Sequence, residues 1–168
     1  MENAGLKGET EKNYKQVADF IKKHKLEDKV SIKEDSRGVI IEMQEKILFD
    51  SGKSELKKSS LEVINKICEL LKQFPNEIIV EGHTDNIPIN KGYFRSNWEL
   101  SADRAVKVVR YMSEVNGLNP KQFKAVGCGE FSPIADNNSP EGRQKNRRVN
   151  ILIVSTEKEN KDNGSKKE

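Results

Sequence analysis

The sequence predicts an α/β sandwich, in which one mixed sheet carries helices packed on one face. The chain has 168 residues, which is enough for one domain with tails and argues against two full hydrophobic cores. Segments with apolar residues at helical spacing, such as 61–71, alternate with strand-sized apolar runs such as 78–80. This alternation is typical of a sheet that is covered by helices.

The N-terminal part predicts one helix and a β-hairpin. Residues 1–12 are polar and are expected to be frayed and flexible, whereas apolar side chains at helical spacing predict a helix over 14–24. Alternating apolar residues predict a strand around 30–32 and a partner strand around 39–43, with Arg37-Gly38 at the turn between them.

The middle of the chain predicts two helices on either side of the apolar strand. Ser59 or Ser60 can cap the first helix, and Pro75 follows its end because proline cannot continue the hydrogen-bond ladder. The segment Ser96-Asn97-Trp98-Glu99 has the form of a capping box and predicts the start of the second helix. Asn116-Gly117 is expected to end that helix.

The C-terminal part predicts two short helices and two strands. Asn119-Pro120 and Ser139-Pro140 each place a capping side chain before a proline, an arrangement that is favoured where helices start. Strands are predicted at 125–127 and 149–154. Residues 155–168 contain no apolar side chain and are expected to be disordered.

Composition argues against several classes of protein. The 30 basic and 27 acidic residues leave a net charge of +3, so a nucleic-acid-binding surface is not indicated and no nucleic-acid partner is expected. No apolar run approaches the ~20 residues that span a bilayer. The N-terminus also lacks the apolar core of a signal peptide. We therefore expect a soluble chain, either on its own or as a fragment of an anchored protein.

Cysteines and catalytic motifs are sparse. Cys68 and Cys128 do not make a disulfide framework; Cys68 is expected to be a buried free thiol, and a bridge between the two is the less favoured alternative. Motifs of serine hydrolases, P-loop proteins and zinc proteases are missing, and the sequence has two histidines. We expect no enzyme activity, no metal site and no cofactor.

The distribution of arginine indicates an acidic ligand group. Of the seven arginines, six lie between Arg95 and Arg148. Arginine is preferred to lysine where two donors grip one carboxylate, and Asp85, after the apolar strand, could bind an ammonium group. A zwitterionic ligand would satisfy both charges. Two plainer interpretations stay open, namely a turn at 81–86 and a surface ion pair for Arg104.

Four motifs, in this order, resemble the OmpA-like peptidoglycan-binding domain: Glu81-Gly82-His83-Thr84-Asp85, Leu100-Ser101-x-x-Arg104-Ala105, Gly127-x-Gly129-Glu130-x-x-Pro133 and Asn146-Arg147-Arg148-Val149. The resemblance covers residues 40–154. The segment Asp85-Asn86-Ile87-Pro88-Ile89 and the 19 positions from Asp85 to Arg104 resemble the MotB-like branch, in which 13–39 would be a linker region.

The resemblance implies a non-catalytic anchor of a flagellar motor stator that grips the diaminopimelate of peptidoglycan. Asp85 would bind its ammonium and Arg104 its carboxylate, with Thr84, Asn97, Leu100 and Arg147 around the same groove. Cys128 departs from the family, which usually has an aromatic residue between the two glycines. The alternatives are a wall anchor outside the flagellar motor and a protein-interaction module without wall binding.

The MotB-like resemblance also implies partners and a location. The domain would form a homodimer, and a MotA-like stator partner would be reached only through a membrane segment that this sequence does not hold. The domain would lie outside the cytoplasm, in the periplasm or cell-wall zone, and the full-length protein would be anchored in the inner membrane.

Overall fold

A computed structural model describes residues 4–89 and 92–156, so most of the predicted C-terminal tail lies outside the described residues. One sheet has the strand order β1-β2-β5-β3-β4, in which β3 and β4 are parallel and the other neighbours antiparallel. The strands are β1 (Ser31–Asp35), β2 (Gly38–Gln44), β3 (Ile78–His83), β4 (Phe123–Gly127) and β5 (Arg148–Val154). The predicted mixed sheet and its N-terminal hairpin are therefore confirmed.

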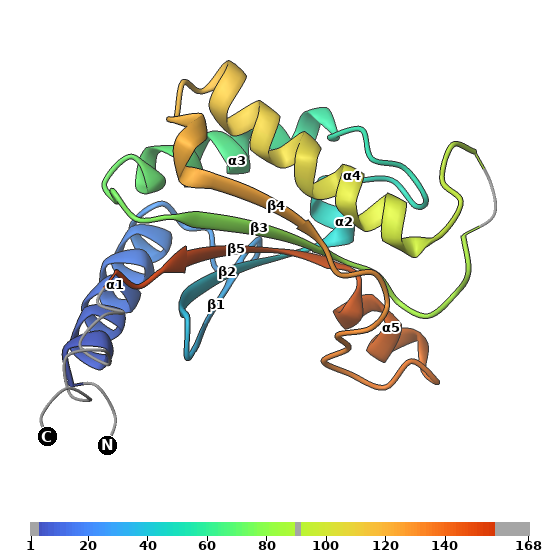
Figure 1. The fold of residues 1–168 in the computed structure, drawn as a ribbon, viewed down its shortest axis with the longest axis horizontal. Coiled ribbons are helices and arrows are strands. Elements are labelled where there is room, and N and C mark those ends of the chain that lie inside the picture. Colours follow the sequence, from blue (N-terminus) through green and yellow to red (C-terminus); the bar gives the residue numbers. More distant parts are fainter. Residues whose placement is uncertain (1–3, 90–91, 157–168) are drawn as a thin grey trace, which may run out of the picture.

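The helices lie over one face of this sheet and at two of its ends (Figure 1). They are α1 (Ala4–Lys23), α2 (Glu45–Leu48), α3 (Lys58–Leu71), α4 (Asn97–Arg110) and α5 (Pro140–Asn146). A π-helical turn, Tyr111–Val115, extends α4, and a 3-10 turn spans Pro120–Gln122. Helices α3 and α4 cover one face, while α1 and α5 lie at opposite ends of the sheet (Figure 1). Within the described residues, no helix combines the length and apolar character needed to cross a membrane.

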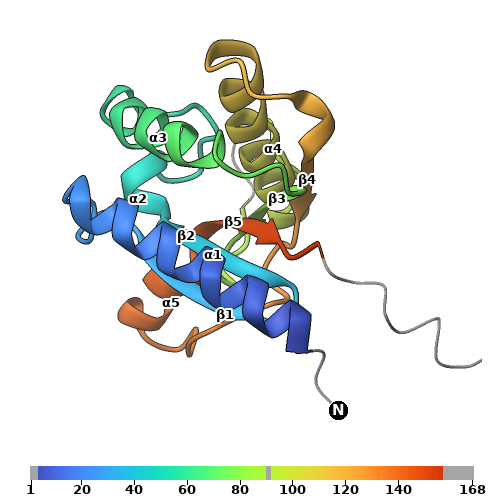
Figure 2. The same ribbon diagram turned by 90° about the vertical axis from the view of Figure 1, so that its left-hand side faces the viewer.

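The hydrophobic core lies between the sheet and helices α1, α3 and α4. Alternate residues of β2 and β5, such as Ile41 and Ile151, pack against Ile64 of α3. Helix α1, which lies in front of β1 and β2 in Figure 2, adds Val17 and Ile21 to the same core. Burying each such side chain contributes about 1.5–3 kcal/mol, so this apolar layer dominates the stabilisation of the fold.

The N-terminal helix begins earlier than predicted. We expected a frayed segment over 1–12, but α1 starts at Ala4. The reason is a set of polar contacts with the end of β5: the Glu9 carboxylate accepts the backbone N–H of Thr156 at 2.9 Å, and the Thr10 and Ser155 hydroxyls lie 2.7 Å apart. Ser155 is buried as well, so the expectation of disorder from residue 155 is wrong at that position.

Three local predictions need correction. Helix α3 starts at Lys58, and neither predicted serine caps it; Ser60 instead donates its hydroxyl to the Lys57 carbonyl. Helix α2 was not predicted, because four residues are too few for a periodic signal. Strand β3 continues through Glu81, Gly82 and His83, which the sequence placed in a polar stretch beyond the strand. The predicted caps at Ser96, Asn119 and Ser139 are confirmed.

Helix α4 lies unusually close to β3 and β4. A Cβ atom on Gly82 would stand 2.1 Å from the Ser101 carbonyl oxygen, and one on Gly127 would stand 2.7 Å from the Ala102 backbone nitrogen. No real side chain tolerates such contacts, so these glycines let the helix backbone rest directly on the strands.

The face of the sheet opposite α3 and α4 carries charged residues. Arg37 places its guanidinium 3.0 Å from the Glu81 carboxylate, and His83 Nε2 lies 4.0 Å from the same group. The neighbouring His83 and the hydrogen-bonded Arg37 lower the pKa of Glu81 to about 2, against the opposing effect of burial. Both cysteines are free, and burial raises the pKa of Cys68 to about 12, so that thiol is inert at neutral pH.

We predict that Gly82→Ala destabilises the fold by about 3 kcal/mol, because the new methyl group meets backbone atoms that cannot move aside cheaply. Chemical denaturation followed by circular dichroism measures the loss. Gly8→Ala is the matched control, since a Cβ at Gly8 meets nothing within 4 Å. Equal stability of the two variants would contradict the close approach of α4.

We also predict an acid-dependent loss of stability through Glu81. Because its folded pKa of about 2 is below the ordinary value of 4.5, its contribution is complete above about pH 4.5 and disappears toward pH 2. At pH 7, Glu81→Gln should be less stable than the wild type by on the order of 1–3 kcal/mol, and the gap should close on acidification. Denaturation at several pH values measures it, with exposed Glu62→Gln as the control; a gap that does not depend on pH counts against this assignment.

Candidate functional site

A groove of about 370 Å³ lies where β3 ends, beside the first turn of α4 and the start of β5. Its walls come from five separate segments of the chain, which the fold brings together: Glu45, Ser51, Gly52, Thr84, Asp85, Ile87, Pro88, Ile89, Asn97, Leu100 and Arg147. The carboxylates of Glu45 and Asp85 and the guanidinium of Arg147 line this one small space, so the groove offers both signs of charge.

Five of the six residues that the resemblance singled out line this groove: Thr84, Asp85, Asn97, Leu100 and Arg147. Thr84 and Asp85 follow the last residue of β3, which holds them at the edge of the sheet. Asn97 and Leu100 lie in the first turn of α4, and Arg147 directly precedes β5.

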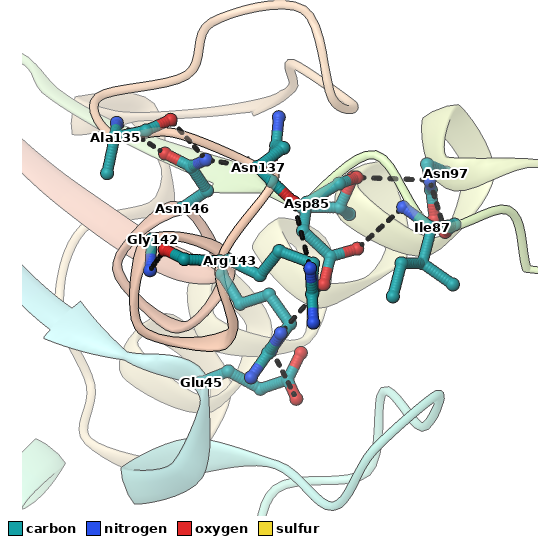
Figure 3. A network of polar contacts seen from close by, with 12 residues as sticks. Glu45, Asp85, Ile87, Asn97, Ala135, Asn137, Gly142, Arg143 and Asn146 are labelled. Atoms are coloured by element: carbon teal, nitrogen blue, oxygen red, sulfur yellow. Dashed lines mark hydrogen bonds and ion pairs between the residues drawn. The ribbon is translucent and has the colours of Figure 1, made fainter.

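Asp85 is held by two hydrogen bonds, and its loop is held by a third residue. Its Oδ2 accepts from Arg147 at 2.7 Å, and its Oδ1 accepts the Ile87 backbone N–H at 3.0 Å. The Asn97 side-chain amide donates to the carbonyls of Asp85 and Ile87, as Figure 3 shows. Asp85 is 6% exposed, and these bonds fix the direction of its carboxylate before any ligand arrives.

Arg147 owes its position to the residue before it. Asn146 is fully buried, and its side-chain oxygen accepts the backbone N–H groups of Ile134 and Ala135 at 2.8 and 2.9 Å. Its amide nitrogen donates to Ala135 and Asn137, which ties the preceding loop to the end of α5 (Figure 3). The anchored backbone delivers the Arg147 side chain to the groove with about a third of its surface exposed.

Arg104 does not line the groove. It is 2% exposed, and its guanidinium donates to the Glu45 carboxylate at 2.6 Å and to the carbonyls of Lys53 and Asp50. Its cationic centre also lies 4.8 Å from the Phe49 ring centroid, within the range of a cation–π contact. All three guanidinium nitrogens therefore have partners within the protein.

Glu45 is the charged groove residue that the sequence analysis missed, beside Ser51, Gly52, Ile87, Pro88 and Ile89. Its carboxylate contacts Arg104 on one side and lies 3.6 Å from Arg147 Nε on the other. It belongs to α2, the short helix that gave no periodic signal, so nothing in the sequence pattern marked it. A chain of alternating charges therefore runs from Arg104, behind the groove, to Glu45, Arg147 and Asp85, which line it.

A second, wider cavity of about 810 Å³ adjoins the groove over the loops at 51–55 and 92–94. The two cavities share Ser51, Gly52, Pro88 and Ile89. No cluster of three or more His, Cys, Asp or Glu side chains suited to a metal ion occurs within the described residues.

Comparison with known proteins identifies relatives of this chain. Residues 48–147 match the profile of the OmpA family. Motility protein B of Bacillus subtilis is 44% identical over 140 residues, which are 83% of this chain and 54% of the relative. The uncharacterized protein YtxE of the same organism is 41% identical over 83% of this chain and 57% of its own length. The chain thus spans about half the length of these relatives.

Solved structures agree in fold. A putative MotB-like protein from Desulfovibrio vulgaris superposes with a TM-score of 0.83 and 27% identity, covering 90% of this chain and 94% of that one. The cell wall anchor of the T6SS from Pseudomonas aeruginosa superposes with a TM-score of 0.75 and 28% identity, covering 83% and 96%. The chain therefore belongs to the OmpA family, as a non-catalytic domain related to motility protein B.

Proposed function

We propose that this chain binds peptidoglycan without catalysis and anchors a flagellar motor stator to the cell wall. The observation that carries the proposal is the Asp85–Arg147 pair, which presents both signs of charge in a groove at the edge of the sheet. The family membership, the 44% identity to motility protein B and the likeness to a cell wall anchor support it.

In the proposed mechanism, the ammonium of diaminopimelate takes the place of the Arg147 guanidinium on the Asp85 carboxylate. The Ile87 backbone N–H keeps its bond to the other carboxylate oxygen, so the acceptor is already oriented. Thr84, Asn97 and Leu100 shape the groove around this point: Asn97 fixes the loop that carries Asp85, and Leu100 supplies an apolar wall. Replacing one charged partner by another avoids leaving a buried charge unpaired.

We assign the carboxylate of the ligand to Arg147, in place of the clamp by Arg104 that the resemblance implied. Arg147 lines the groove and is freed when the ammonium occupies Asp85, whereas Arg104 lies behind Glu45 with its donors engaged. Arg104 then acts as a positioning residue that holds Glu45, which in turn faces Arg147.

The setting in the cell belongs to the same proposal. The domain would act outside the cytoplasmic membrane, as a homodimer, and would meet a MotA-like partner through a segment beyond residues 1–168. The likeness to YtxE and to the T6SS anchor favours a second candidate, a wall anchor outside the flagellar motor. Deleting the gene separates the two, because loss of swimming is expected only for the stator anchor.

The first prediction concerns ligand capture by Asp85. Asp85→Asn should lower the affinity for purified peptidoglycan by about 10- to 100-fold, because a charge-assisted hydrogen bond contributes about 1.5–3 kcal/mol. A sedimentation assay measures it, with exposed Asp28→Asn as the matched control. Unchanged binding by a folded Asp85→Asn protein rejects the assignment of this pocket.

The second prediction separates the two arginines. Arg147→Ala should lose peptidoglycan binding with a smaller loss of stability, because its own side chain is about a third exposed and the buried Asp85 carboxylate keeps the Ile87 backbone N–H. Arg104→Ala should lower stability by about 3–5 kcal/mol, because it removes a fully paired buried guanidinium and leaves the partly buried Glu45 carboxylate without its 2.6 Å partner. Thermal unfolding and sedimentation, run on both variants, give the answer. An Arg104→Ala protein that has normal stability but no longer binds would show that Arg104, and not Arg147, binds the ligand carboxylate.

A further inference from the structure

Two aromatic side chains outside the groove form a stacked pair on the surface. The Trp98 and Phe131 ring centroids lie 4.9 Å apart with an interplanar angle of 26°. Trp98 is 50% exposed and Phe131 is 63% exposed. Large apolar rings that stay this exposed commonly mark a binding surface, and the mechanism proposed above uses neither of them.

The pair is held rigidly by its surroundings. The Ser96 side chain accepts the Trp98 backbone N–H at 3.1 Å, at the start of α4. Gly129 donates its backbone N–H to the Ser101 hydroxyl at 3.0 Å, which fixes the loop that carries Phe131. Gly129 has a φ of +59°, and a Cβ built there would make ordinary van der Waals contact with both rings at 3.4 Å, so this loop passes close beside the pair.

The pair also adjoins the groove. Trp98 follows Asn97, which lines the groove, and consecutive Cα atoms are about 3.8 Å apart. On the other side, the Gly129 carbonyl accepts the backbone N–H of Thr84, a second groove residue, at 2.9 Å. The backbone segments that carry the aromatic pair are therefore joined directly to the backbone of the groove at Asn97 and Thr84.

We propose that Trp98 and Phe131 are a stacking platform for a sugar ring of the glycan strand. The inference rests on the proposed function, because the peptide of peptidoglycan is bonded to a sugar and brings that sugar with it. Diaminopimelate is the third residue of the peptide, and about 3.3–3.6 Å per residue keeps the sugar within roughly 10 Å of the groove.

The chemistry of the pair suits a sugar ring. A pyranose has an apolar C–H face and a polar rim of hydroxyls, and an aromatic ring offers a flat apolar surface of matching size. Exposed polar residues follow both aromatic rings in the chain, Glu99 after Trp98 and Ser132 after Phe131. Tyr93 also adjoins the groove's neighbouring cavity, but it is 99% exposed and is not preorganised by packing.

The test compares a free stem tripeptide containing diaminopimelate with the same tripeptide bonded to its disaccharide. By calorimetry, the wild type should bind the disaccharide form about three- to tenfold more tightly. Trp98→Ala and Phe131→Ala should each remove that advantage and keep the tripeptide affinity, while Tyr93→Ala changes neither. Trp98 is the only tryptophan, so its fluorescence should shift with the disaccharide form and not with the tripeptide.

Three outcomes overturn the platform. The first is equal affinity of the wild type for both ligands, which leaves the proposed function standing. The second is an equal loss of both affinities in Phe131→Ala, which would make the pair part of the groove's structure. The third is a change of oligomeric mass in sedimentation of either variant, which would make the pair a contact between copies of the chain. If neither ligand binds, the proposed function fails and the platform fails with it.

Discussion

The close approach of α4 to β3 and β4 is the constraint on which the rest of the site depends. Gly82 and Gly127 remove the side chains that would separate helix from sheet, and Ser101 lies directly on β3. Because α4 is fixed this close to the sheet, its first turn contacts the loop after β3, and the Asn97 side chain can donate to the carbonyls of Asp85 and Ile87. The helix also holds the loop after β4 through Ser101, so one packing contact sets several walls of the groove.

Buried charge is the second constraint, and the fold meets it by pairing. Arg104 and Arg148 are 2% and 4% exposed, and each finds backbone carbonyls for its guanidinium. Burial lowers the pKa of Arg148 although Glu42 and Glu81 act to raise it, which shows that holding a positive charge at this buried position costs free energy. Arg147, by contrast, keeps about a third of its side chain in contact with solvent and hydrogen-bonds only the Asp85 carboxylate, so of these three arginines it can exchange partners at the smallest cost.

Much of the fold follows from local patterns, whereas part of the site does not. The alternation of apolar residues predicted the strands, and the capping motifs predicted the helix starts at Ser96, Asn119 and Ser139. Both signals are local, because each depends on residues only a few positions apart. Arg147 lines the groove whereas Arg148 points to the opposite side of the sheet, because successive residues at a strand face opposite sides. Glu45 and the burial of Arg104 could not be predicted, because their contact joins residues 59 positions apart and depends on a helix of four residues. The early start of α1 likewise depends on a distant partner, the end of β5.

The alternating charges of the groove bear on selectivity as well as on affinity. The ion pair between Asp85 and Arg147 already satisfies both groups, so a ligand gains little by offering one charge. An amine alone would leave Arg147 with only the longer contact to Glu45, and a carboxylate alone would leave Asp85 with only the Ile87 backbone N–H; either removes the closest ionic partner of a partly desolvated charge. A ligand that carries an ammonium and a carboxylate on one carbon atom replaces both partners in one step. Under the proposed function, the groove would thus favour the zwitterionic end of an amino acid over an amine or a carboxylate alone.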